Sequence, residues 1–277
     1  MSRGVDLHLH STASDGGRSP AEVLDDAAVA GLAAVALTDH DTVSGIQEAR
    51  VRAAELGIEF CPGVEMTAYV GKAELHIIGL FIDCRESGVV DLLGELGRER
   101  EARSGRIASR LRDVGLEITA DEINALAAGV PGRMHVAKAL VERGYVSDIQ
   151  EAFRRYIGDN GPGYVEKRRL TPAEVIGAIR EAGGISSLAH PGLSNRDEMI
   201  PELARIGLDA IETYYPHHTR RQTEHYQRLA AKNGLLETGG SDYHGVFKAS
   251  VHIGEPHVPY ELYERLRERV AAVGSGD

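Results

Sequence analysis

Residues 5–10 of this 277-residue chain read Val-Asp-Leu-His-Leu-His, and no other short stretch of the sequence is as informative about its fold. Side chains of a β-strand point alternately to opposite faces, so His8 and His10 share one face while the apolar residues share the other. Two imidazoles about 7 Å apart at the end of a strand can reach one divalent ion. A pair of solvated histidines is the alternative. The stretch therefore predicts a strand with two candidate metal ligands.

Further apolar runs of strand length follow along the chain and alternate with helical patterns. The runs cover 34–38, 58–60, 75–81, 185–189, 210–214 and 235–238. Helix starts are marked by Ser19-Pro20-Ala21-Glu22 and Thr171-Pro172-Ala173-Glu174, each with a hydroxyl N-cap, a proline at the first position and a glutamate at the third. Strands that alternate with helices in this way predict an α/β fold with a largely parallel sheet.

The alternation stops in the middle of the chain, where only helical patterns occur. These patterns cover 98–114, 119–128, 133–143 and 147–157, and a glycine-rich loop at 158–163 follows them. We therefore expect a barrel-like domain formed by residues 1–97 and 167–277, with a small all-helical insertion domain at 98–166.

Charge and composition limit the class of protein. The 31 Lys and Arg residues against 42 Asp and Glu give a net charge of −11, which disfavours binding of long duplex nucleic acid through bulk charge. No apolar run approaches the roughly 20 residues of a membrane span. The two cysteines, Cys61 and Cys84, cannot form a disulfide framework, which suits a reducing compartment. We expect a cytoplasmic protein that does not act at a membrane.

Seven more potential metal ligands follow the histidine pair, most of them where a predicted strand gives way to a loop. They are Asp15, His40, Glu65, His76, His190, Asp242 and His244. The carboxyl ends of parallel strands in a barrel converge on one face, so ligands far apart in sequence would meet there. Each residue alone could be an ordinary polar group at a strand end. The full set at successive strand ends predicts a metal site.

The order of the motifs carries a family resemblance. The motifs HxH, SDGG, TDHD, PGxE, LHIIG, AHP and GSDYHG follow one another along essentially the whole chain. This order closely resembles the PHP family, the polymerase and histidinol phosphatase superfamily of metal-dependent phosphoesterases. The helical insertion and the SDG form of the first turn are similar to its nucleoside-bisphosphatase and ribonuclease AM branch. The resemblance implies a distorted (βα)7 PHP barrel that holds two to three divalent metal ions.

The resemblance also implies how the ligands are shared. His8, His10, Glu65 and Asp242 would hold the first metal. Glu65 would bridge to a second metal, which His76 and His190 complete. A third metal would be held by Asp15, His40 and His244.

The ligand types indicate the metal and the reaction. Mixed imidazole and carboxylate ligands suit Mn²⁺, with Fe²⁺ or Zn²⁺ as alternatives, better than Mg²⁺ or Ca²⁺. A pair of such ions activates water for attack on phosphorus, so we expect a metal-bound hydroxide held by Glu65, Asp242 and His190 as the nucleophile, with no covalent enzyme intermediate.

Substrate contacts are predicted mainly in the insertion. Arg133 and His135 stand at the start of a helix, whose free N–H groups favour an anion; a surface arginine and a capping histidine are the alternative. Lys167 belongs to a basic run that could face the site or be a solvated loop. His217 is a possible proton donor to the leaving group. The tyrosine rings at 214 and 215 could stack on a base or pack in the core.

These inferences lead to a functional hypothesis with named alternatives. We expect a phosphoric monoester hydrolase that removes the 5′-phosphate of small nucleotides, with 3′,5′-bisphosphonucleotides preferred over AMP-like substrates. Stepwise 5′-to-3′ trimming of short 5′-phosphorylated RNA by the same attack is a related possibility. Histidinol-phosphate phosphatase is the alternative enzyme, and a non-catalytic metal-binding or interaction protein is the alternative of a different class.

Overall fold

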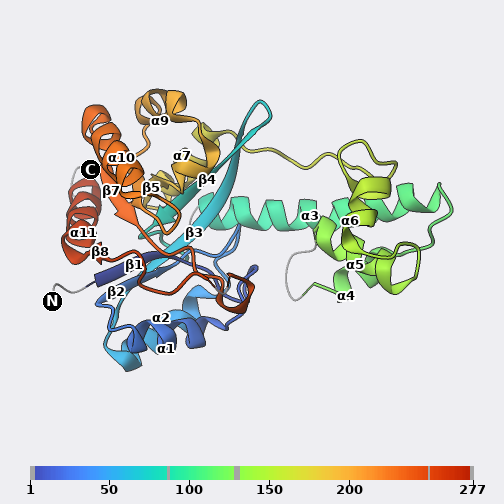
Figure 1. Cartoon of the computed structure of the whole chain (residues 1–277), viewed down its shortest axis with the longest axis horizontal. Coiled ribbons are helices and arrows are strands. Elements are labelled where there is room, and N and C mark those ends of the chain that lie inside the picture. Colours follow the sequence, from blue (N-terminus) through green and yellow to red (C-terminus); the bar gives the residue numbers. More distant parts are fainter. Residues whose placement is uncertain (1–3, 86–87, 128–131, 249, 275–277) are drawn as a thin grey trace. The chain divides into compact units, whose positions relative to one another are not determined.

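A computed structural model describes residues 4–85, 88–127, 132–248 and 250–274. The chain divides into two compact units, a larger unit of Met1–Leu92 with Arg169–Asp277 and a smaller unit of Leu93–Arg168 (Figure 1). The smaller unit begins before residue 98, because helix α3 (Gly88–Arg112) starts ten residues earlier than the pattern indicates. Val89, Leu93 and Leu96 form one buried helical face, which carries the helix through Gly94 and Gly97.

The larger unit is built on one eight-stranded sheet. Its strands are β1 (Gly4–Leu9), β2 (Ala34–Leu37), β3 (Glu59–Val70), β4 (Ala73–Leu80), β5 (Ile185–Leu188), β6 (Ala210–Tyr214), β7 (Leu236–Gly239) and β8 (Val258–Pro259). The strand order is β7-β6-β5-β4-β3-β2-β1-β8. Pairing is parallel except where β4 meets β3 and β5 and where the two-residue β8 meets β1. The expected α/β fold class is confirmed.

The sheet curls into a nearly closed barrel because the segment after β7 hydrogen-bonds to β1. The backbone N–H of Asp242 donates to the carbonyl of His8 at 2.9 Å, and the N–H of His10 donates to the carbonyl of Tyr243 at 3.0 Å. Gly240 lies directly against β1 at this closure, since a Cβ placed there would come within 2.4 Å of the Cβ of His8. The two ends of the sheet thus bring residues 8–10 and 242–244 side by side.

Helices flank the sheet strands in the larger unit (Figure 1). They are α1 (Pro20–Val29), α2 (Ile46–Leu56), α7 (Pro172–Glu181), α8 (Pro191–Ser194), α9 (Ile200–Arg205), α10 (Arg220–Asn233) and α11 (Tyr260–Gly274). Ser19 and Thr171 form the capping boxes that the sequence predicts at the starts of α1 and α7. Strand β1 is buried on both faces, with its apolar residues and His8 all shielded from solvent.

The boundary predicted for the third strand is wrong. The pattern ends that strand at residue 60 because Pro62 and Gly63 normally signal a turn, whereas β3 continues to Val70 and forms an antiparallel hairpin with β4. Pro62 stands at the last position paired with β2, where Leu37 is its partner. Gly63 lets β3 pass close to its neighbours, because a Cβ there would meet the carbonyl oxygen of Gly79 at 2.9 Å. Glu65 therefore lies inside a strand and not just beyond one.

The smaller unit is helical among its described residues. Besides most of α3, it contains α4 (Ala120–Ala125), α5 (Arg133–Glu142), α6 (Ile149–Ala152) and a π-helical turn at Phe153–Ile157. Its own apolar core includes Leu111, Ile118 and Leu140. Within the described part of the chain, no helix combines the length and the apolar character needed to span a membrane.

Candidate metal centre

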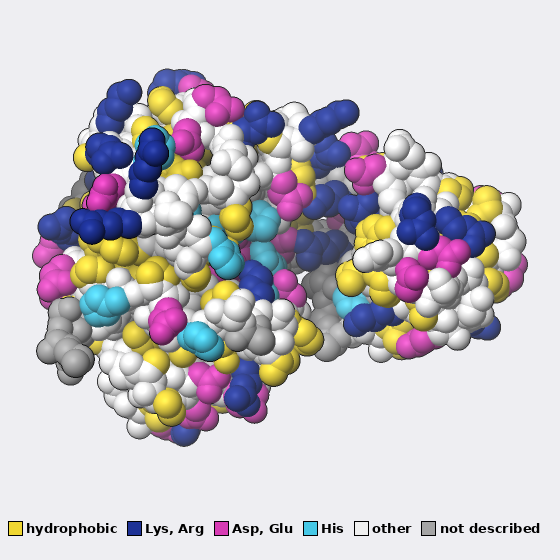
Figure 2. Space-filling view, in the orientation of Figure 1, with side chains coloured by type: hydrophobic (Ala, Val, Ile, Leu, Met, Phe, Trp, Pro, Cys, Tyr) yellow, Lys and Arg dark blue, Asp and Glu magenta, His cyan; other side chains and the backbone are white. Residues whose placement is uncertain are grey.

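The structure places all nine predicted metal ligands in one cluster of the larger unit. They come from β1, β3, β4 and the segments that follow β1, β2, β5 and β7: His8, His10, Asp15, His40, Glu65, His76, His190, Asp242 and His244. His8, His10 and Glu65 are fully buried, whereas the side chain of Asp15 is 56 % exposed. Figure 2 shows a group of histidine side chains at the surface of this unit. The cluster therefore has a buried floor and an open edge.

Glu65 is at the centre of the cluster. Its Oε2 lies 3.2 Å from one ring nitrogen each of His8, His10 and His40. Its Oε1 lies 2.9 Å from Nδ1 of His76 and 3.1 Å from Nε2 of His190. One carboxylate thus serves two separate groups of imidazoles, which is the arrangement needed to bridge two ions.

The remaining ligands adjoin the same cluster through Asp242 and Asp15. Oδ1 of Asp242 lies 3.3 Å from Nε2 of His10 and 3.4 Å from Nδ1 of His244. Oδ1 of Asp15 lies 3.4 Å from Nε2 of His244, and its Oδ2 lies 3.8 Å from Nε2 of His40. Among the described residues, three overlapping groups have ligand atoms that all lie within 4.8 Å of one another. The groups are His10, Asp15, His40 and His244; His8, His10 and Glu65; and His40, Glu65 and His76.

The hydrogen bonds around the cluster fit bound divalent ions. Nδ1 of His8 donates to Oε1 of Glu212 at 2.9 Å, and Nδ1 of His244 donates to the backbone carbonyl of Asp242 at 2.8 Å. In the neutral imidazole each of these bonds leaves the Nε2 lone pair directed into the cluster, as metal-binding histidines require. Nδ1 of His10 is buried without a hydrogen-bond partner. The donor atoms are nitrogen and oxygen with no sulfur, which suits Mn²⁺, Fe²⁺ or Zn²⁺.

The charges of the cluster depend on one another. Burial favours the protonated form of Glu65, but the histidines around it, His8 first among them, hold the pKa of this carboxyl well below its usual range. Burial likewise opposes charge on His10, yet hydrogen bonds to Asp242 and Glu65 raise the pKa of His10 to about 9. Burial lowers the pKa of His40 to about 4. Because a cation displaces protons from its ligands, an ion bound at His10 would compete with a proton there.

The backbone is strained at two of the predicted ligands. His190 has φ 27° and Asp242 has φ 55°, both in the left-handed region that residues other than glycine rarely adopt. Asp242 is held there by the closure of the barrel on β1, and His190 by hydrogen bonds around it. Such conformations persist where the surrounding structure enforces them, and they occur preferentially at functional sites.

Glu212 contacts two predicted ligands, and the sequence analysis does not name it. This buried glutamate of β6 accepts from Nδ1 of His8 through Oε1, and from the backbone N–H of His190 through Oε2 at 2.6 Å. It therefore orients ligands of both imidazole groups around Glu65. The sequence does contain a signal for such a role. A glutamate inside the apolar strand 210–214 would be costly to bury without partners, so its presence there indicates polar partners in the core.

Replacing Glu212 with Gln is expected to weaken Mn²⁺ binding by about 10- to 100-fold, because the amide can no longer fix the tautomer of His8 and the position of residue 190 together. Isothermal titration of the metal-stripped protein with Mn²⁺ measures this change. Glu237→Gln on the neighbouring strand is the matched control, since its described hydrogen bond is to Thr213 and not to a predicted ligand. Equal affinity of the Glu212 variant and the wild type would rule out the positioning role.

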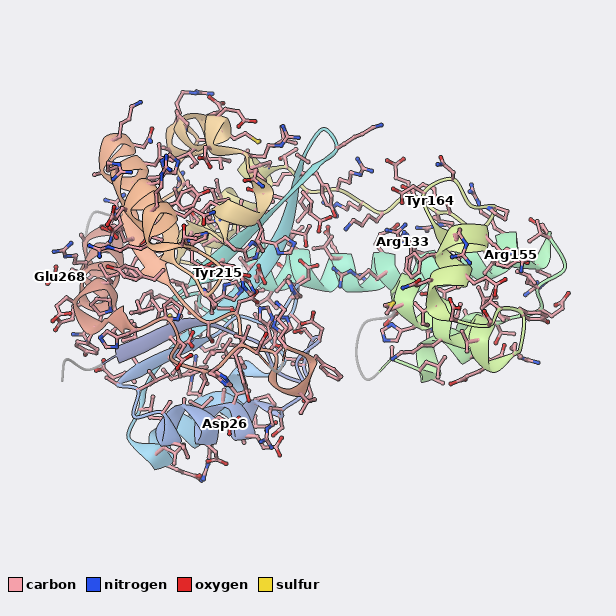
Figure 3. All side chains as sticks on the ribbon, viewed as in Figure 1. Asp26, Arg133, Arg155, Tyr164, Tyr215 and Glu268 are labelled. Carbon is pink, nitrogen blue, oxygen red and sulfur yellow. The ribbon has the colours of Figure 1, made fainter. Side chains whose placement is uncertain are left out.

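Two side chains beside the predicted ligands have clear structural roles. The carboxylate of Asp39 accepts from Ser11 and Ser14 and so fixes the loop that leads to Asp15. Tyr215 is only 3 % exposed, and its ring packs 5.5 Å from that of His190 (Figure 3). Of the two alternatives for this ring, core packing is therefore correct.

The predicted substrate residues lie in different parts of the chain. Arg133 pairs with Asp159 at 2.8 Å, and its guanidinium lies 5.7 Å from the ring of Phe153 and 5.9 Å from that of Tyr164 (Figure 3). Nδ1 of His135 accepts from the backbone N–H of Gly132, which caps α5. Lys167, like these two, belongs to the smaller unit. His217 is exposed in the larger unit, beside the ring of Tyr215. Pro131, just before the start of α5, lies outside the described residues.

Comparisons with known proteins agree with this geometry. The profile of the PHP domain matches residues 6–166. A 5′-3′ exoribonuclease of Haemophilus influenzae is 36 % identical over 88 % of this chain and 91 % of its own. A 3′,5′-nucleoside bisphosphate phosphatase of Chromobacterium violaceum is 32 % identical over 96 % and 97 %. A phosphoribosyl 1,2-cyclic phosphate 1,2-diphosphodiesterase of Eggerthella lenta is 33 % identical over 90 % and 97 %.

The fold is shared with a solved structure. A protein of Bifidobacterium adolescentis, assigned as a metal-dependent phosphoesterase, superposes with a TM-score of 0.79 at 29 % identity, over 97 % of each chain. The family match covers more than half of the chain, and it includes the segments that carry His8, His10, Asp15, His40, Glu65 and His76. The chain therefore belongs to the PHP domain family of metal-dependent phosphoesterases.

Proposed function

We propose that this chain removes the 5′-phosphate from small nucleotides, with 3′,5′-bisphosphonucleotides preferred, and that it trims short 5′-phosphorylated RNA by the same reaction. The observation that carries the proposal is the position of Glu65, whose two oxygens each face a separate group of imidazoles. The relatives named as a bisphosphate phosphatase and an exoribonuclease support this choice of substrate. The acidic charge of −11 favours small substrates over long duplexes.

We propose two to three Mn²⁺ ions, with Fe²⁺ or Zn²⁺ as alternatives, held as the family resemblance implies. When bound, such ions lower the pKa of water and neutralise charge on phosphoryl oxygens. The chain itself holds the ligands in place: Glu65 spans the two imidazole groups, Glu212 orients His8, and the donors Tyr215 and Lys248 occupy Oδ2 of Asp242 at 3.0 and 2.7 Å. Oδ1 of Asp242 then remains directed into the cluster.

The phosphate ester approaches from the open edge of the cluster. Asp15, His40 and His76 are partly exposed there, whereas His8 and His10 are fully buried. Glu65, Asp242 and His190 would position the attacking water. His217 is the proposed donor of a proton to the leaving group. Water must reach phosphorus from the side opposite that group, so the buried floor and the open edge limit the reactive orientations.

Recognition of the rest of the substrate is proposed for the helical insertion, predicted at 98–166. Arg133 would bind a phosphate by exchanging its carboxylate partner, Asp159, which is itself exposed. His135 and Lys167 would add polar contacts. The proposed location is the cytoplasm, where nucleotides and short RNA are available.

A hydrolysis panel with Mn²⁺ tests the function. The substrates are adenosine 3′,5′-bisphosphate, AMP, a 5′-phosphorylated RNA trimer, a ribose 1,2-cyclic phosphate and histidinol phosphate. We expect the highest kcat/KM for the bisphosphate, with release of the 5′-phosphate only. Preference for histidinol phosphate or for the cyclic diester would replace the proposed substrate, and a metal-loaded protein inactive on all five would favour a binding protein.

A further inference from the structure

Large apolar side chains are exposed beside the metal centre. Among the described residues, the exposed large hydrophobic side chains are Val29, Val51, Val70, Val114, Met134, Leu193, Val246 and Phe247. Three of these follow a predicted ligand by no more than three residues: Leu193 after His190, and Val246 and Phe247 after His244. Phe247 is 72 % exposed and is the one aromatic ring in this described set. Its exposure cannot be explained by packing.

The turn that carries Phe247 is anchored to the metal centre on both sides. It is the short helical turn Gly245–Lys248, which directly follows His244. Before it, the carbonyl of His244 accepts from the backbone N–H of Gly17 at 3.0 Å. After it, the ammonium of Lys248 lies 2.7 Å from Oδ2 of Asp242. Residue 247 is therefore held at the rim of the cluster within the larger unit.

The same turn packs on the loop that contributes Asp15. A Cβ placed on Gly17 would come within 2.7 Å of Cγ2 of Val246, so the turn lies against the Ser14-Asp15-Gly16-Gly17 segment. Asp15 marks the exposed edge of the cluster, with a side chain 56 % exposed. Phe247 consequently lies on the side of the site from which a phosphate ester enters.

We propose that Phe247 is the surface on which the base of the nucleotide substrate stacks. This inference rests on the proposed function, because it assigns a place to the base of that substrate. Every nucleobase has a π-face, so stacking on an exposed aromatic ring does not depend on the hydrogen bonds that distinguish one base from another. The adjacent Lys248 brings positive charge, which suits the anionic nucleotide better than an apolar protein partner. Of the two tyrosine rings considered for this role, Tyr215 is buried, and Tyr214 is partly buried against the core with its hydroxyl accepting from Nε2 of Gln227.

The test compares a nucleotide with the same phosphate ester lacking a base. For Phe247→Ala, kcat/KM for AMP should fall by about 10-fold, within the range of one lost stacking contact. Hydrolysis of ribose 5-phosphate should not change. Phe247→Trp should retain the wild-type ratio of the two substrates. Val29→Ala, which removes another exposed apolar side chain at the end of α1, should change neither rate.

A spectroscopic measurement keeps the inference separate from the proposed activity. The fluorescence of 2-aminopurine riboside 5′-phosphate should be quenched when it binds the metal-loaded wild type, and the quenching should be lost in Phe247→Ala. Equal loss of activity on both substrates, or quenching that persists in Phe247→Ala, would overturn the stacking role. A wild-type dimer that becomes a monomer on this substitution would assign Phe247 to a protein interface instead. Failure of the proposed function would appear differently, as a wild type inactive on every phosphate ester.

Discussion

Glu65→Gln is expected to reduce the turnover of phosphate esters by about 10³-fold or more, because bound ions supply several kcal/mol of charge stabilisation and each 1.36 kcal/mol is tenfold in rate. The substitution keeps the size of the side chain but removes its negative charge and replaces one of its two acceptor oxygens with a donor. Glu65 faces five imidazoles in the structure, three through Oε2 and two through Oε1.

Metal content and turnover measured on the same samples check this prediction. Elemental analysis should show fewer Mn²⁺ ions per chain in Glu65→Gln than in the wild type. Glu237→Gln, whose carboxylate accepts from Thr213, should keep both metal and activity. A Glu65 variant with the full complement of ions and near-normal turnover would show that this carboxylate does not bridge the ions.

Gly240→Ala is expected to lower the melting temperature by about 5–10 °C, because overpacking of a tight site costs about 1–3 kcal/mol or more. The added Cβ would meet the Cβ of His8 at 2.4 Å and its backbone nitrogen at 2.5 Å. These atoms belong to β1 and cannot move aside as a flexible side chain could. The barrel must open at its closure, and His8 must shift relative to Asp242. Affinity for Mn²⁺ should therefore fall together with stability.

Gly177→Ala is the control for this substitution. Gly177 lies inside α7, where a Cβ would meet no other atom within 4 Å. Alanine is the better helix former by about 1 kcal/mol, so this variant should melt at or above the wild-type temperature. Thermal unfolding followed by circular dichroism compares the two. If Gly240→Ala melts like the wild type and binds Mn²⁺ equally well, the closure of the barrel does not position His8.

The sequence was sufficient to predict which nine residues cluster, because each predicted ligand stands in a short local motif. The pair at 8 and 10 follows from strand alternation, and most of the others are polar residues near the ends of apolar runs. Long-range pairing was harder to predict. β3 continues through Pro62 and Gly63 only because β2 ends there and β4 takes over as its partner. The local sequence shows the turn propensity of these two residues. It does not show that pairing with β4 keeps them in a strand.

Residues that act through a ligand were missed for a similar reason. Glu212 and Tyr215 contact His8, His190 and Asp242 across the barrel, and none of these contacts is local in sequence. For Arg133 the sequence left two alternatives, a contact with phosphate and an ordinary surface arginine, because a guanidinium at a helix start suits either. The pairing with Asp159 shows which partner it has within its own unit, while its contact with substrate stays a prediction.

The central claim is that the nine clustered residues bind divalent ions and that these ions are required for hydrolysis of a nucleotide 5′-phosphate. It is tested most directly by stripping the protein of metal, adding Mn²⁺ in steps, and measuring bound ions per chain and phosphate release from adenosine 3′,5′-bisphosphate on the same samples. The account predicts no release without metal, and release that rises as two to three ions bind. Full activity of the metal-free protein, or complete loading without release of the 5′-phosphate, would contradict it.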